Sequence, residues 1–175
     1  MNPKIIIRPE SPADISAISD VTIAAFATLE ISFHTEQFIV AALRAAKTLT
    51  VSLVAELEGR VVGDIAFSPV SISDGTGKWY GLGPLSVLPE VQQQGIGKAL
   101  MAEGLVRLQG LNAGGCCLVG HPDYYRKFGF DNLPGLQRAL PKSGLHHAGQ
   151  GVAASGGRLR SRVRLSALAG RKLCR

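Results

Sequence analysis

A predicted strand, a glutamine-rich turn and a glycine-opened helix follow one another between residues 81 and 100. The strand ends at Pro89, the turn spans residues 92–94, and Gly-Ile-Gly at residues 95–97 opens the helix. Glycine lets backbone N–H groups approach a ligand closely. The first turn of a helix adds unpaired N–H donors at the positive end of its dipole. This succession predicts a site for phosphate oxygens.

Composition places the chain among globular proteins. Its 175 residues, 46% of them hydrophobic, suit one domain with a sizeable core. No apolar run approaches the roughly 18–20 residues that span a bilayer, and residues 1–5 show no secretory signal. The three cysteines (Cys116, Cys117 and Cys174) are an odd number without metal-ligand spacing. We therefore expect reduced thiols, a cytoplasmic setting and no contact with membranes.

The net charge of +6 is distributed very unevenly along the chain. Residues 1–136 contain ten Lys or Arg and thirteen Asp or Glu, whereas residues 137–175 contain nine Lys or Arg and no acid. The body is therefore acidic and the tail basic. No aromatic residue is interleaved in this tail to stack on bases, which argues against a nucleic-acid partner.

The first third of the chain predicts a strand and two helices. A strand is expected at residues 4–8, and Ser11-Pro12-Ala13-Asp14 is typical of a helix start. Helical spacing predicts an apolar stripe on each of two helices, and the stripe of the first helix should face the core. The stripes are Ile15, Ile18, Val21, Ala25 and Phe26 in the first helix, and Phe38, Ile39, Ala42 and Leu43 in a second helix capped by Thr35.

The next hundred residues alternate between strands and helices. Two strands at residues 51–57 and 61–72 meet at the hairpin signal Glu58-Gly59. A third strand at residues 79–88 is interrupted by Gly83-Pro84, where a bulge is expected. A helix at 95–109, a buried strand at 116–119 and a short helix at 122–128 complete a mixed sheet covered by helices.

Two of these segments together resemble the signatures of the GNAT superfamily of N-acetyltransferases. Residues 92–97 (Gln-Gln-Gln-Gly-Ile-Gly) are similar to its pyrophosphate loop, and residues 120–130 are similar to its second signature. The resemblance covers about residues 4–135. It implies an α+β, three-layer fold with a mixed, mostly antiparallel central sheet, splayed strands and flanking helices. We assign residues 1–136 to this domain and regard residues 137–175 as a basic, atypical tail, not a separate domain.

The resemblance implies acetyl-CoA as acetyl donor and no metal. Backbone N–H groups of the turn would cradle the pyrophosphate, and the strand edge before the turn would pair with the amides of pantetheine. The residues so implicated in cofactor binding are Leu85, Ser86, Val87, Gln92, Gln93, Gln94, Gly95, Ile96, Gly97 and Lys98.

The same resemblance implies the reaction, a direct transfer of the acetyl group to a primary amine of a small molecule or protein. Tyr125 is carried over as general acid, and the Leu85 N–H would stabilise the oxyanion. Glu30 and His34 are weakly marked as candidate bases, and a covalent route through the cysteines is disfavoured. A CoA-binding module with little turnover is the alternative, and homodimer formation is left open.

The tail departs from the family pattern, which ends in further strands. Residues 137–175 show no convincing strand, and their Arg, Ala, Gly and Ser content is what an out-of-frame reading of GC-rich DNA would produce. The hypothesis is that a frameshift, real or in sequencing, replaced the natural end. Resequencing the gene tests this hypothesis. A clean reading frame, with no alternative frame that codes for patterned strands, would contradict it.

Overall fold

The computed structural model describes residues 5–27, 35–72, 75, 77–131 and 151–155. Its elements in chain order are β1 (Ile5–Pro9), the 3-10 turn η1 (Pro12–Asp14), α1 (Ile15–Phe26), α2 (Glu36–Ala45), β2 (Val51–Leu57), β3 (Arg60–Val70), β4 (Trp79–Val87), the 3-10 turn η2 (Pro89–Val91), α3 (Ile96–Gly110), β5 (Gly115–Val119), α4 (Pro122–Arg126) and β6 (Gly151–Ser155). The strands pair in the order β1-β2-β3-β4-β5-β6.

The chain forms two compact units, and β3, β4 and α3 each contribute residues to both. Unit 1 comprises residues 1–68 and 83–108, and unit 2 comprises residues 69–82 and 109–175. The phosphate-site candidates belong to unit 1, whereas Tyr125 belongs to unit 2.

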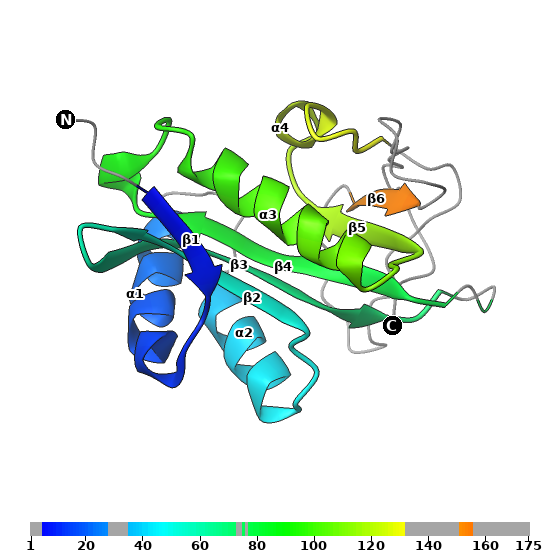
Figure 1. The fold of residues 1–175 in the computed structure, drawn as a ribbon, viewed down its shortest axis with the longest axis horizontal. Helices are drawn as coiled ribbons and strands as arrows, with labels where there is room; N and C mark the ends of the chain where they lie inside the picture. The colour runs from blue at the N-terminus through cyan, green and yellow to red at the C-terminus, as the bar shows by residue number, and fades with distance from the viewer. Residues whose placement is uncertain (1–4, 28–34, 73–74, 76, 132–150, 156–175) are drawn as a thin grey trace. The chain divides into compact units, whose positions relative to one another are not determined.

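In unit 1, an antiparallel sheet has helices on both faces (Figure 1). Strand β2 pairs antiparallel with both β1 and β3, and Glu58 (φ 51°) and Gly59 (φ 81°) form the predicted hairpin turn. On β3, the Asp64 side chain meets Thr22 of α1. The neighbouring Gly63 lies against Ile96 of α3. Because successive strand residues point to opposite faces, α1 and α3 cover opposite sides of the sheet.

A network of hydrogen bonds to Asp14 fixes the start of α1, where the sequence predicts a helix start. The backbone N–H and hydroxyl of Ser11 both donate to Asp14 Oδ2, at 2.7 and 2.8 Å. Arg8 of β1 donates two further bonds to the same carboxylate, at 2.7 and 2.9 Å. Arg8 also donates to Glu56 of β2 at 2.8 Å. The network therefore joins the first strand, the helix start and the second strand.

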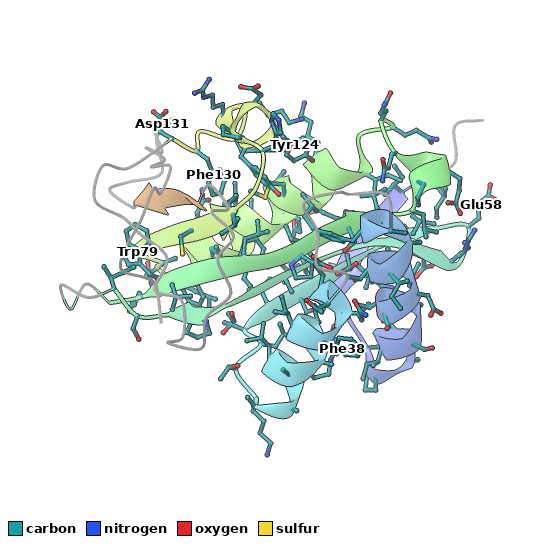
Figure 2. All side chains as sticks on the ribbon, turned by 180° about the vertical axis from the view of Figure 1, so that it is seen from behind. Phe38, Glu58, Trp79, Tyr124, Phe130 and Asp131 are labelled. Atoms are coloured by element: carbon teal, nitrogen blue, oxygen red, sulfur yellow. The ribbon has the colours of Figure 1, made fainter. Side chains whose placement is uncertain are left out.

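The apolar stripe predicted on one side of α2 is largely exposed. Phe38, labelled on α2 in Figure 2, is 65% exposed. Ile39 is 48% exposed, Ala42 is exposed and Leu43 is half-buried, whereas Val40 is the buried residue of the helix. Val40 packs with Ile18 of α1 and Val54 of β2. The orientation of α2 is explained by its last turn, where Arg44 binds Glu10 at 3.0 and 2.7 Å.

The stripe of α1 is largely confirmed. Ile18, Val21 and Ala25 are buried and Phe26 is half-buried. Ile15 is an exception, since it is 40% exposed where η1 passes into α1. Its position at the very start of the helix leaves it beside solvent.

In unit 2, β5 lies between β4 and β6. It pairs in parallel with β4 and antiparallel with β6. A strand at Gly151–Ser155 corrects the expectation that the basic tail supplies none. Small residues with weak β-propensity conceal such a strand in the sequence, although its ladder with β5 depends only on backbone groups. The rest of the tail lies outside the described residues, and its frameshift origin stays a prediction.

Within the described ranges, no helix is long and apolar enough to cross a membrane.

Candidate active site

Strand β4 parts from its ladder with β5 halfway along. Among the described residues, the pairs of this parallel ladder are Trp79 with Gly115, Tyr80 with Cys116 and Gly81 with Cys117. The ladder ends two residues before Gly83-Pro84, where the sequence predicts an interruption. Pro84 has no N–H to donate to a partner strand.

The second half of β4 lies in unit 1 and runs beside β3. Among the described residues, its pairing with β5 does not extend beyond Gly81. The N–H of Leu88 donates to Val62 O on β3 at 2.9 Å. Backbone polar groups alternate in direction along a strand, so those of Ser86 also point towards β3. Those of Leu85 and Val87 consequently point to the opposite edge, whereas Ser86, predicted as a pantetheine partner with them, has its backbone groups turned towards β3. The roles of all three in cofactor binding stay predictions.

The glutamine-rich turn (residues 92–94) is tied back to that edge. Gln92 Nε2 donates to Val87 O at 2.9 Å. Gln93 and Gly95 both have positive φ, 62° and 86°, the left-handed conformation that occurs in anion-binding nests of backbone N–H groups. The Gly95 carbonyl accepts the Ala99 N–H at 2.9 Å and so begins α3.

The predicted residues of the turn and helix start lie together in unit 1. Gln92, Gln93, Gln94, Gly95 and Lys98 are exposed and Gly97 is half-buried. Ile96 is only 1% exposed, so its side chain belongs to the core and its backbone alone can serve a ligand. The first N–H groups of α3, a helix of 15 residues, have no partner within the helix.

Tyr125 lies in a compact aromatic cluster of unit 2. Its ring is edge-on to Tyr124, with centroids 5.0 Å apart, and 6.0 Å from the ring of Phe130. A Cβ on Gly120 would collide with the Tyr125 ring, so the glycine leaves the space that the ring fills. Burial, with smaller effects of Tyr124 and Cys116, raises the pKa of the phenol above its ordinary value.

The residues around Tyr125 make local contacts. His121 is the N-cap residue of α4, and its carbonyl accepts the Tyr124 N–H at 3.1 Å. Lys127 Nζ stands 3.7 Å from the centre of the Tyr124 ring. Cys116 is buried and Cys117 half-buried. The candidate bases Glu30 and His34 lie outside the described residues.

A buried carboxyl group in unit 1 escaped the sequence analysis. Asp64 is 1% exposed and lies beside the hydroxyls of Thr22 and Ser86, which are fully buried. Burial raises the pKa of Asp64 to about 7, although bonds from Ser86 and Thr22 oppose the rise. The signal available in the sequence is an acid at the centre of the apolar strand Val61–Phe67.

The side chains that could bind a metal ion do not cluster in the part of the chain that the structure describes. In the described part of the chain, no group of three or more His, Cys, Asp or Glu residues could hold a metal ion. The candidate residues of unit 1 therefore offer backbone donors and glycines, and those of unit 2 offer the Tyr125 hydroxyl.

Comparison with known proteins agrees with this architecture. Residues 49–132 match the family model of the acetyltransferase (GNAT) domain. YhbS of Escherichia coli K12, an uncharacterised N-acetyltransferase, is 35% identical over 130 residues, which are 73% of this chain and 74% of YhbS. The fold and the match together define an acyltransferase. The chain belongs to the GNAT family of N-acetyltransferases.

Two solved structures extend the comparison. A GNAT acetyltransferase from Brucella melitensis in complex with acetyl-CoA has a TM-score of 0.75 and 43% identity, covering 93% of this chain and 95% of that one. YhbS from Escherichia coli in complex with CoA has a TM-score of 0.69 and 28% identity, covering 97% and 84%.

Proposed function

We propose that this chain transfers the acetyl group of acetyl-CoA directly to a primary amine. The observation that carries the proposal is the turn between β4 and α3. Positive φ at Gln93 and Gly95 and the open start of α3 make an anion site. The Brucella relative, 43% identical, was solved with acetyl-CoA.

In this proposal the cofactor follows the free edge of β4 into the turn. The pyrophosphate oxygens accept hydrogen bonds from the backbone N–H groups of residues 93–98, and Lys98 adds a positive charge. The pantetheine amides pair with the edge that carries the backbone groups of Leu85 and Val87, while Ser86 lies between them. Gln92 contributes indirectly, because its side chain holds the turn against Val87 O.

The chemistry then needs two donors. As the amine nitrogen bonds to the thioester carbon, the Leu85 N–H stabilises the negative charge on oxygen. When the carbon–sulfur bond breaks, the electron pair leaves with the sulfur and the Tyr125 hydroxyl supplies its proton. The attacking nitrogen gives up its own proton to solvent or a base, and solvent returns a proton to the Tyr125 phenolate, which restores the starting state. The raised pKa of Tyr125 keeps this hydroxyl protonated at neutral pH.

Tyr125→Phe separates the enzyme from a CoA-binding module. We expect Tyr125→Phe to bind acetyl-CoA as the unchanged chain does, while kcat falls roughly 10²-fold or more. Release of free CoA in the presence of a panel of primary amines measures the rate. Phe128→Tyr is a matched control that adds a phenol elsewhere in the cluster. A chain that binds acetyl-CoA and acetylates no amine would instead be a binding module.

The proposal covers small-molecule and protein amines alike. Tests of both acceptor classes belong in the same panel. Cytoplasmic location and homodimer formation stay predictions.

A further inference from the structure

Thr22, Asp64 and Ser86 join three elements of unit 1 in the core. Thr22 Oγ1 donates to Asp64 Oδ1 at 3.3 Å, and the Thr22 and Ser86 hydroxyls lie 3.3 Å apart. A side-chain bond also links Ser86 to Asp64. The three groups therefore make a ring of contacts between α1, β3 and β4, and none of the proposed chemistry uses it.

The number of hydrogens determines which form of Asp64 completes the ring. Each hydroxyl carries one hydrogen, and an ionised carboxylate carries none. Two hydrogens cannot satisfy three contacts. A protonated Asp64 supplies the third hydrogen, so that each group donates once and accepts once. Burying an ionised carboxylate is also costly in the absence of a paired charge.

The surroundings of Asp64 favour its neutral form. Glu10, which follows β1, raises its pKa and Arg44 of α2 lowers it. Glu10 and Arg44 carry opposite charges and bind each other at 2.7 Å, so their effects on the pKa of Asp64 oppose each other. From the remaining elements, α1 presents Thr22, β4 presents Ser86, and β2 presents Val54 as the cross-strand partner. Desolvation remains as the largest influence on the carboxyl group.

The ring contacts β4 at Ser86, between the two residues whose backbone groups we assign to the cofactor. Ser86 lies between Leu85 and Val87, whose backbone groups point to the free edge. The carbonyl of Ser86 would stand 2.9 Å from a Cβ on Gly63, which shows how closely β3 and β4 pack here. A displacement of Ser86 would therefore turn the donors on both sides of it.

We propose that Asp64 is a positioning residue, whose protonated form completes a hydrogen-bond ring with Thr22 and Ser86 and thereby aligns the edge of β4 for acetyl-CoA. The inference rests on the proposed function. When Asp64 ionises, one contact of the ring loses its hydrogen, and the edge fits the cofactor less well.

Asp64→Asn and Thr22→Val test the ring from two sides. An amide can donate to one hydroxyl and accept from the other, so Asp64→Asn keeps the ring at every pH. Thr22→Val preserves shape and removes one member. Thr48→Val is the matched control, because Thr48 is exposed and bonds only locally to Leu43 O at 3.2 Å. Titration calorimetry with acetyl-CoA at about pH 6 and pH 8.5 gives the affinities, and urea unfolding verifies that each variant is folded.

We expect the unchanged chain and Asp64→Asn to bind acetyl-CoA equally at the lower pH. At the higher pH the unchanged chain should bind about fivefold more weakly than Asp64→Asn, the effect of about one hydrogen bond. At the lower pH, Thr22→Val should bind acetyl-CoA about fivefold more weakly than the unchanged chain, and Thr48→Val should bind it with unchanged affinity.

A merely structural Asp64 would change the stability and leave the affinity of the folded protein and its pH profile unmoved. Parallel profiles for the unchanged chain and Asp64→Asn overturn the inference, as does normal binding by Thr22→Val. Should Asp64→Asn not fold, Thr22→Val decides. Absence of binding by the unchanged chain contradicts the proposed function itself, and the inference with it.

Discussion

The side chain of Gln92 reaches back and donates a hydrogen bond of 2.9 Å to the carbonyl oxygen of Val87. The end of β4 and the turn that follows it are therefore held together by one exposed side chain. The two backbone segments that we assign to acetyl-CoA, the strand edge and the turn, consequently keep a fixed spacing.

Replacement of Gln92 by alanine should weaken acetyl-CoA binding with little loss of stability. The bond is exposed, so its removal costs the fold little, whereas the turn becomes free to move. We expect about a fivefold rise in the Kd for acetyl-CoA, measured by titration calorimetry. Gln109→Ala, at the exposed far end of α3, is the matched control. An unchanged Kd for Gln92→Ala would show that the turn holds its shape unaided.

The packing of α3 on β3 depends on Gly104. A Cβ there would stand 2.5 and 2.8 Å from ring atoms of the fully buried Phe67. Gly104→Ala should therefore lower the free energy of unfolding by about 1–3 kcal/mol in urea denaturation. Gly110→Ala, with open space around it, should be neutral or slightly stabilising. Equal effects of the two substitutions would contradict the close contact.

Asp14 should make the stability depend on acidic pH. Hydrogen bonds from Arg8, and less strongly from Ser11, hold the pKa of this carboxyl below its ordinary value, although burial opposes them. A depressed folded-state pKa contributes stability above the unfolded-state pKa, and this contribution is lost as the pH falls through the folded value. Asp14→Asn should thus cost about 1.5–3 kcal/mol near pH 7, the value of hydrogen bonds to a charged group.

The difference in the free energy of unfolding between the unchanged chain and Asp14→Asn should narrow below about pH 4, where Asp in the unfolded state becomes protonated. Urea unfolding at several pH values measures it. A difference that stays constant across the acidic range would mean that the Arg8 pair contributes little through charge.

The sequence predicted the element order because strong local signals mark most boundaries. Glu58-Gly59 fixes the hairpin, Ser11 and Asp14 fix a helix start, and Gly95 begins α3. These signals act over a few residues, so they are legible without knowledge of the tertiary structure. The fold class and the glycine turn follow from them.

Properties set by tertiary contacts were harder to predict. Phe38 and Ile39 belong to an apolar stripe by helical spacing, yet α2 turns Val40 inward because Arg44 binds Glu10. Asp64 appears in the sequence as one acid in an apolar strand. Only folding brings Thr22 and Ser86, 42 and 22 positions away in the sequence, to the same carboxyl group.

Titration of the purified chain with acetyl-CoA, beside Gly95→Ala, tests the central claim most directly. Gly95 has φ 86°, which alanine adopts only under strain, and nothing lies within 4 Å of its added Cβ. We expect saturable one-site binding that Gly95→Ala weakens about tenfold, while Gly110→Ala binds normally. Binding that is absent from the folded chain, or that is indifferent to Gly95→Ala, would contradict it.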